Sequence, residues 1–234
     1  MYGKKLEEIK RKRAALLLKH EIEGEGKENT ISGKKEPERE EKKIIAEERH
    51  IVVLGTAAAG YALKKIEEDG EALQGLNSQF VKIEAEKIKL ISGENFGKMK
   101  EIALENAEDV RIGGEGGIFA SLWDVCTEYG TGLKCQLPKI PISSLVIELC
   151  EDGDTNPYLA DYSGSIIAVT TKPEKLLEAV KEYLKEKMEE KGGETNRNNE
   201  IYENLLIAEI GHLISGPEKK IINGDEVRSL SPEY

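Results

Sequence analysis

Residues 110–123 read VRIGGEGGIFASLW, and this segment indicates more about the architecture of the chain than any other. Its first residues predict a short strand, and the apolar residues after the glycines recur with helical spacing. Glycines let the backbone adopt positive φ and approach a ligand closely, and the first N–H groups of a helix have no partner within it. A strand that passes through glycines into a helix is therefore the general layout of an anion site.

The glycine segment Gly113–Gly117 supports two interpretations on its own. It matches neither of the phosphate-binding patterns GxGxxG and GxxxxGK[ST], and no lysine follows it. A plain tight turn is therefore at least as well supported as a phosphate-binding turn. Its one acidic residue, Glu115, is suited to face a metal ion or a substrate amine, but a solvent-exposed turn carboxylate is the commoner outcome.

A second candidate contact surface is Tyr162-Ser163-Gly164-Ser165, directly before residues 166–169, whose apolar character predicts a strand. Small hydroxyl residues beside a glycine at the start of a strand leave backbone and hydroxyl groups available to a ligand. The alternative is a strand that needs a bend where it begins, and this interpretation is slightly the better supported of the two.

The rest of the chain mixes helix and strand patterns. Apolar spacing predicts helices at about 57–68, 80–90, 98–106, 118–125, 145–150 and 174–188. Strands are predicted at 50–54, 110–112, 132–137, 165–170 and 205–214, and a hairpin pairs 220–222 with 227–230 around Asn223-Gly224. Because the order lacks strict βαβ regularity, we predict the α+β class with a mixed sheet.

The amino-terminal segment differs in composition from the remainder. Residues 4–19 predict a helix among alternating charges, and residues 20–43 contain many Glu, Lys and Gly but almost no large apolar residues. Such a stretch buries too little surface to offset its ordering entropy, so we expect a flexible linker. The 234-residue chain is thus predicted to comprise a charged helix plus linker, residues 1–43, and one domain, residues 44–234, with a polar insertion at Lys191–Glu200.

Composition argues against two classes of partner. The chain carries 34 Lys and Arg against 45 Asp and Glu, and the excess of acid lies after residue 50. An acidic body repels phosphate backbones, so no nucleic-acid partner is expected. No apolar run approaches the roughly 18 residues of a membrane span, so no membrane partner is expected either.

Cysteines and histidines do not form a recognisable reactive pattern. The three cysteines, Cys126, Cys135 and Cys150, form no CxxC pair and have no neighbouring histidine, so we interpret them as buried thiols of a cytoplasmic protein. The histidines show no triad or metal spacing and are interpreted as structural: His20, His50 and His212.

Several segments occur in an order that resembles the AIR-synthase-related and hydrogenase-maturation (HypE-like) proteins. Residues 116–123 resemble the glycine-led helix of that family, and residues 163–169 resemble its central strand. Further matching segments are 139–142, 147–150, 156–158, 210–213 and 221–226. The resemblance covers about residues 108–232, and residues 51–65 are more weakly similar to the strand and helix that lead into the same domain.

The resemblance implies a three-layer α/β/α domain with a mixed sheet, like the carboxy-terminal domain of AIR synthase. It also implies ATP and Mg²⁺ as cofactors, because relatives use ATP to activate an amide, acid or carbamoyl oxygen or to phosphorylate an alcohol. In those relatives an amino-terminal domain supplies the Mg-binding aspartates, and the carboxy-terminal domain covers the cleft. Carried over, the phosphate-facing turn is Gly113, Gly114, Glu115, Gly116 and Gly117, and Ser163, Gly164 and Ser165 also line the cleft.

The sequence departs from the family in three places. Nothing in residues 1–50 resembles the Mg-binding aspartates, and Arg111-Ile112 stands where the family often has His-Asp. The chain ends at residues 231–234 without the terminal cysteine that receives the carbamoyl group in hydrogenase-maturation members. We therefore assign no catalytic residue and no metal ligand.

These departures favour a non-catalytic relative that binds a ligand or a protein. The main alternative is one subunit of a split ATP-dependent enzyme, completed by a partner chain that carries the nucleotide-binding domain. A self-associating chain that keeps residual activity is the third possibility.

Overall fold

The computed structural model describes residues 48–68, 73–190 and 205–231. The chain divides into two compact units, residues 1–45 and 46–234, and all described residues belong to the second. The helix predicted at 4–19, the linker at 20–43 and the insertion Lys191–Glu200 lie outside the described residues.

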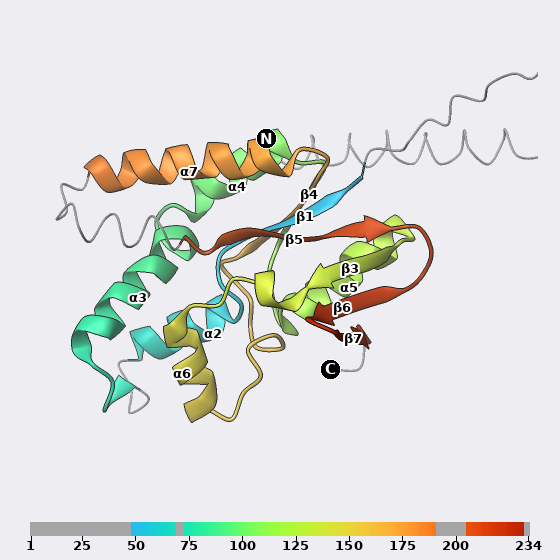
Figure 1. The fold of residues 1–234 in the computed structure, drawn as a ribbon. Helices are drawn as coiled ribbons and strands as arrows, with labels where there is room; N and C mark the ends of the chain where they lie inside the picture. Colours follow the sequence, from blue (N-terminus) through green and yellow to red (C-terminus); the bar gives the residue numbers. More distant parts are fainter. Residues whose placement is uncertain (1–47, 69–72, 191–204, 232–234) are drawn as a thin grey trace, which may run out of the picture. The chain divides into compact units, whose positions relative to one another are not determined.

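The described residues form one mixed sheet in the order β2-β4-β1-β5-β3-β6-β7 (Figure 1). Neighbouring strands are antiparallel except β3 and β6, which are parallel. The strands are β1 (His50–Leu54), β2 (Asp109–Ile112), β3 (Gly132–Gln136), β4 (Ile166–Thr170), β5 (Ile207–Ile214), β6 (Lys219–Asn223) and β7 (Glu226–Ser229). The predicted α+β class with a mixed sheet is confirmed.

Helices cover both faces of the sheet. They are α2 (Ala59–Glu67), α3 (Ser78–Ser92), α4 (Phe96–Asn106), α5 (Gly117–Tyr129), α6 (Ser144–Asp152) and α7 (Pro173–Glu190), with a short 3₁₀ helix, η2 (Leu137–Lys139). Val52 and Leu54 of β1 pack with α2, α3, α4, α6 and α7, whereas Ile51 and Val53 pack with α5 on the other face. Burial of β1 on both faces explains its continuous apolar run, and it yields the three layers that the resemblance implied.

Two predicted boundaries shift because the backbone turns there. The helix expected from residue 57 begins at Ala59, since Gly55 (φ 113°) and Ala58 (φ 53°) form a turn whose Ala57 N–H donates to the carbonyl of Pro141 at 2.8 Å. The last hairpin is confirmed, but Asn223 pairs with Glu226, so the loop residues are Gly224 and Asp225. Gly224 adopts the positive φ of 60° that such a two-residue loop requires.

One end of the sheet collects most of the segments singled out from the sequence. Leu54, the last residue of β1, pairs with Ile166 of β4 and with Ile207 of β5. Ile112, the last residue of β2, also pairs with Ile166. The glycine turn after β2, the turn after β1 and the chain leading into β4 therefore meet at the same edge of the sheet, which we call the glycine-turn end.

Candidate functional site

The glycine turn is fixed against the chain that leads into β4. Gly113 donates its N–H to the carbonyl of Ser165 at 2.9 Å, and the carbonyl of Gly114 accepts from Tyr162 N–H at 3.0 Å. A Cβ on Gly113 would lie 2.3 Å from the Tyr162 carbonyl oxygen, so only glycine permits this approach. The two segments chosen from the sequence are thus in direct contact.

The outer part of the turn faces solvent. Glu115 and Gly116 are exposed, and Gly116 (φ 82°) precedes the first residue of α5, Gly117 (φ 74°). Helix α5 continues with Phe119, whose N–H donates to the carbonyl of Tyr158 at 3.3 Å and whose ring stacks on the Tyr158 ring at 5.1 Å. The first residues of α5, Gly117 and Ile118, are buried, so the exposed part of the turn is Glu115 and Gly116.

The three residues at the start of β4 have different surroundings. Ser165 is fully buried and its hydroxyl donates to the carbonyl of Thr56 at 3.1 Å, so this hydroxyl stabilises the fold. Ser163 is exposed, and its hydroxyl donates to Asp161 Oδ1 at 2.6 Å. Gly164 (φ 85°) packs against Ser92 of α3. Only Ser163 and Gly164 remain close to a surface that a ligand could reach.

Arg111, directly before the turn, is ion-paired on its own strand and on α5. Its Nη2 lies 3.0 Å from Asp109 Oδ2 and 2.7 Å from Glu128 Oε2. Burial lowers the pKa of Arg111, but the two carboxylates more than offset this, so its pKa lies above the usual value. Arg111 is therefore a cation that ties strand β2 to α5.

A pocket of about 570 Å³ opens at the same end of the sheet, and the sequence did not reveal it. Its walls are the loop 137–144, residues 205–208, Tyr158, Glu84 and Lys87. Tyr158 thus contacts α5 through its ring and carbonyl and also lines the pocket. Tyr158 is therefore in contact with the helix that follows the glycine turn and also forms part of the pocket wall.

Two buried charges line this pocket. Lys87 Nζ lies 2.7 Å from Glu84 Oε1, and these side chains are 10% and 9% exposed. Glu84 Oε2 accepts from the hydroxyl of Ser143 at 2.8 Å and from Ser144 N–H at 3.1 Å. Burial raises the pKa of Glu84, but the hydrogen bonds from Lys87 and Ser143 outweigh it, so its pKa lies below the ordinary value. The carboxylate therefore stays ionised at the start of α6.

Two histidines that are distant in sequence become neighbours through strand pairing. His50 of β1 is in register with His212 of β5, and their ring centroids are 6.4 Å apart. His50 Nδ1 lies 2.7 Å from Glu209 Oε1, and His212 Nε2 lies 3.3 Å from Glu48 Oε1. Among the described residues, no group of three or more His, Cys, Asp or Glu side chains is placed to hold a metal ion.

The cysteines are free and buried, as predicted. Burial raises the pKa of Cys126 to about 11 and that of Cys135 to about 12, and it also raises the pKa of Cys150. These thiols are therefore protonated at neutral pH, whereas nucleophilic chemistry requires the thiolate.

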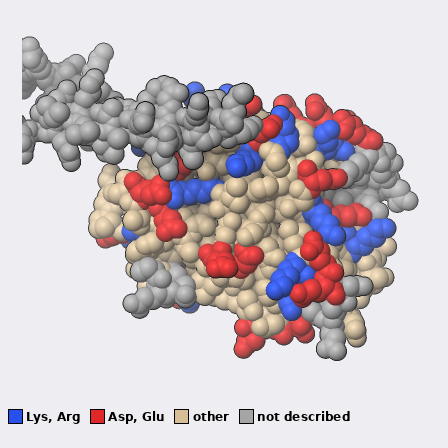
Figure 2. Space-filling view, turned by 180° about the vertical axis from the view of Figure 1, so that it is seen from behind, with Lys and Arg blue, Asp and Glu red and all other residues tan. Residues whose placement is uncertain are grey.

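Charges on the surface are mixed. Figure 2 shows acidic and basic side chains interspersed around a broad uncharged area on the face opposite to that of Figure 1. On the described part of this face there is no continuous basic patch of the kind that follows a phosphate backbone. None of the described helices has both the length and the apolar character needed to cross a membrane.

Known structures match the fold, although no protein-family model and no curated protein sequence matches the chain. HypE in a HypE-HypF complex is 18% identical with a TM-score of 0.52, and the match covers 78% of this chain and 52% of that one. Escherichia coli HypE is 13% identical with a TM-score of 0.54, and the match covers 82% of this chain and 52% of that one. The chain thus shares its fold with part of these HypE structures, and it spans about half of their length.

Proposed function

We propose that this chain is a HypE-like, AIR-synthase-related protein that binds a ligand or a protein at its glycine-turn end and does not catalyse ATP-dependent phosphoryl transfer alone. The observation that carries this proposal is the pairing of Arg111 with Asp109 and Glu128. Arg111 and the exposed, apolar Ile112 stand where relatives, by resemblance, often have His-Asp, so Arg111 is a cation tied into the fold and Ile112 takes the place of the acid. The shape of the turn is retained while its chemistry differs.

The residues around the turn fit a phosphate group only in part. The start of α5 offers the positive end of a helix dipole, but Gly117 and Ile118 are buried and the N–H of Phe119 already donates to the carbonyl of Tyr158. The turn itself exposes the side chain of Glu115, whose carboxylate repels phosphate and competes with it for hydrogen-bond donors. Phosphoryl transfer depends on Mg²⁺ and cations that neutralise developing charge. The described residues at the turn therefore do not suffice for Mg·ATP, and we derive no reaction step for this chain.

One observation favours the alternative of a split ATP-dependent enzyme. The chain spans 52% of the HypE structures it resembles, and one of these is a complex of HypE with HypF. A partner chain that carries the nucleotide-binding domain would supply the Mg-binding aspartates that, by resemblance, this chain lacks. The buried free thiols of this chain are compatible with the reducing cytoplasm, and we propose that the protein is cytoplasmic.

The deciding experiment combines a native pull-down of the full chain with thermal unfolding of the purified chain in Mg·ATP. Under this proposal Mg·ATP alone leaves the melting temperature unchanged. A ligand at a hundredfold excess over Kd stabilises a protein by about 2.7 kcal/mol, so a clear rise would show that the chain binds Mg·ATP without a partner and would contradict this part of the proposal. Recovery of a nucleotide-binding partner that restores ATP binding would favour the split enzyme.

Gly114→Val tests whether captured partners use the turn. A Cβ on Gly114 meets no atom within 4 Å, so the larger side chain obstructs the surface without disturbing the fold. The matched control is Gly97→Val in α4, where a Cβ also meets nothing within 4 Å. Loss of binding in Gly114→Val alone supports the proposal, and equal binding by both variants removes the turn from the interface.

A further inference from the structure

The pocket beside Tyr158 has the dimensions of a small-molecule site. Its volume of about 570 Å³ lies within the roughly 300–1,000 Å³ typical of ligand pockets. Apolar residues of its walls include Ile140, Pro141 and Leu206. Polar groups enter from α3 and from the start of α6, so the pocket combines apolar residues with polar and charged groups, and polar atoms form the larger part of its exposed lining.

Lys87 has more hydrogen-bonding capacity than its surroundings use. Its ammonium group carries three donors, and among the described residues the hydrogen bond formed by Nζ is the one to Glu84. The side chain is 10% exposed, and burying a charge is costly unless it is well hydrogen-bonded. The remaining donors of Lys87 are therefore suited to an acceptor that enters from the pocket.

Glu84 differs because its oxygens are already occupied. One oxygen accepts from Lys87 and the other accepts from Ser143 and Ser144. Of this pair, Lys87 has donors to spare, whereas the oxygens of Glu84 are engaged. Lys139, an exposed residue of the same wall, adds a second positive charge.

We propose that this pocket binds a small molecule that places a phosphate or carboxylate group at Lys87 and an apolar part against Ile140, Pro141 and Leu206. Charge-assisted hydrogen bonds from an ammonium to such an oxyanion are among the stronger polar contacts in proteins. Tyr158 forms one side of the site. Burial raises the pKa of its phenol, and the electrostatic effect of the nearby Cys135 raises it further, so the phenol stays a neutral donor. The proposal is independent of any binding at the glycine turn.

Two substitutions change the proposed affinity in opposite directions. Lys87→Met keeps the apolar stem and removes the ammonium, so oxyanion binding should weaken at least about tenfold. Glu84→Gln retains an acceptor for Ser143 and Ser144 but removes the charge that holds Lys87, so binding should tighten several-fold. A purely structural role for the pair predicts that neither change alters the affinity of a folded variant.

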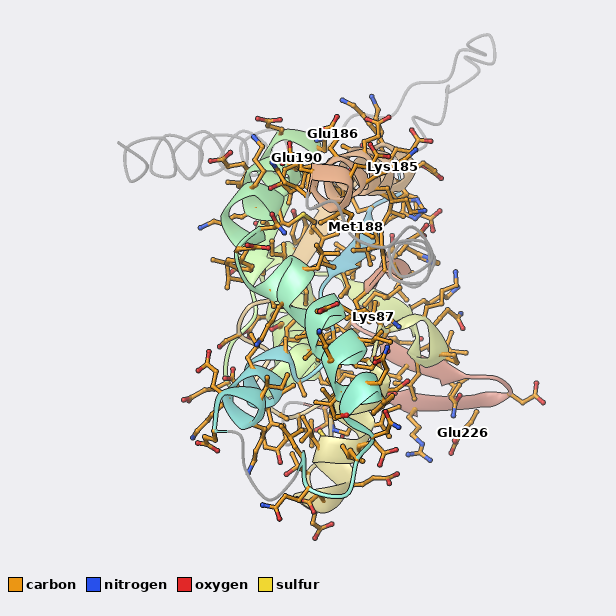
Figure 3. The ribbon with its side chains drawn as sticks, turned by 90° about the vertical axis from the view of Figure 1, so that its left-hand side faces the viewer. Lys87, Lys185, Glu186, Met188, Glu190 and Glu226 are labelled. Carbon is orange, nitrogen blue, oxygen red and sulfur yellow. The ribbon has the colours of Figure 1, made fainter. Side chains whose placement is uncertain are left out.

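Lys185→Met provides the matched control. Lys185 is an exposed lysine near the end of α7, and Figure 3 shows it well separated from Lys87 on α3. The same substitution there removes the same charge from the protein without touching the pocket. A general effect of net charge on anion binding would appear equally in both variants.

The test is a titration of the full ¹⁵N-labelled chain, followed by amide chemical shifts, with phenyl phosphate, benzoate and benzyl alcohol in separate arms. Phenyl phosphate, benzoate or both should shift the amides of Ser144 and Ala208, and benzyl alcohol should bind more weakly. The more effective anion identifies the head group. Saturating shifts that depend on Lys87 and not on Lys185 are the expected result.

Three results would overturn the inference. They are an absence of shifts around the pocket, equal affinity in wild type and Lys87→Met, or shifts confined to residues 113–117. The last result would support binding at the glycine turn while rejecting this pocket, so the two proposals fail separately. If Lys87→Met does not fold, unchanged affinity in Glu84→Gln is sufficient to reject the site.

Discussion

The backbone of Gly117 passes so close to Tyr158 that a Cβ at residue 117 would lie 2.2 Å from the Tyr158 carbonyl oxygen. The same glycine has a φ of 74°, a backbone conformation that residues with a side chain rarely adopt. Two independent constraints therefore select glycine at the first residue of α5. The contact joins the helix to the chain that separates the glycine turn from the pocket.

Gly117→Ala should destabilise the domain by about 2–5 kcal/mol, because both the contact and the backbone conformation become strained. Gly114→Ala should change stability by less than about 1 kcal/mol, since its Cβ meets open space. Urea unfolding of the two variants measures the contrast. Equal stability would mean that the turn does not rest against Tyr158.

Ser165→Ala tests the interpretation that this serine stabilises the fold. The change removes a buried hydroxyl and leaves the carbonyl of Thr56 without that donor, which should cost about 1–3 kcal/mol. Ser163→Ala, at an exposed residue of the same segment, should stay within about 0.5 kcal/mol of wild type. Denaturant midpoints that fall equally for both variants would contradict the assignment.

Local patterns predicted the architecture more reliably than they predicted the site. The Asn223-Gly224 hairpin and the continuous apolar run of β1 depend on neighbouring residues, so the sequence shows them directly. Ser165 was predicted to be accessible because nothing in the neighbouring sequence indicates that a small hydroxyl residue beside a glycine is buried. Its burial follows from the approach of Thr56, more than a hundred residues away in the chain.

The pocket escaped prediction for the same physical reason. Glu84 and Lys87 are three residues apart on a helix, a spacing that usually indicates an exposed surface pair. Their partner Ser143 comes from a different helix start, and only the packing of α3 against α6 brings it near. Likewise, the register of β1 and β5 brings His50 beside His212, and this register cannot be predicted from the spacing of residues along the sequence.

The thiols should resist modification in the native protein. Burial holds the pKa values of Cys126 and Cys135 at about 11 and about 12, and Cys150 is also shielded. A disulfide reagent such as DTNB at pH 8 should therefore release almost no thiolate chromophore from the folded chain. In denaturant all 3 cysteines should react. Rapid labelling of the folded chain would show that a thiol is accessible.

The Glu84 carboxylate should make the stability of the domain depend on acid. Its native pKa lies below the ordinary value of 4.5, because hydrogen bonds from Lys87 and Ser143 outweigh the opposing effect of burial. The unfolded chain therefore binds this proton first as the pH falls. The stabilisation from Glu84 is complete above pH 4.5 and is lost as the pH falls through the lower native pKa.

Glu84→Gln isolates this contribution. At pH 7 the variant should be less stable than wild type by about 1–3 kcal/mol, because charged hydrogen bonds become neutral ones. The difference should shrink as the pH is lowered from 5 towards 3, because protonation removes the same charge from the wild type. Urea unfolding across that range measures it, with Glu178→Gln at an exposed position of α7 as the control. A difference that stays constant with pH would mean that the Glu84 carboxylate is not the ionised partner of Lys87 in the native state.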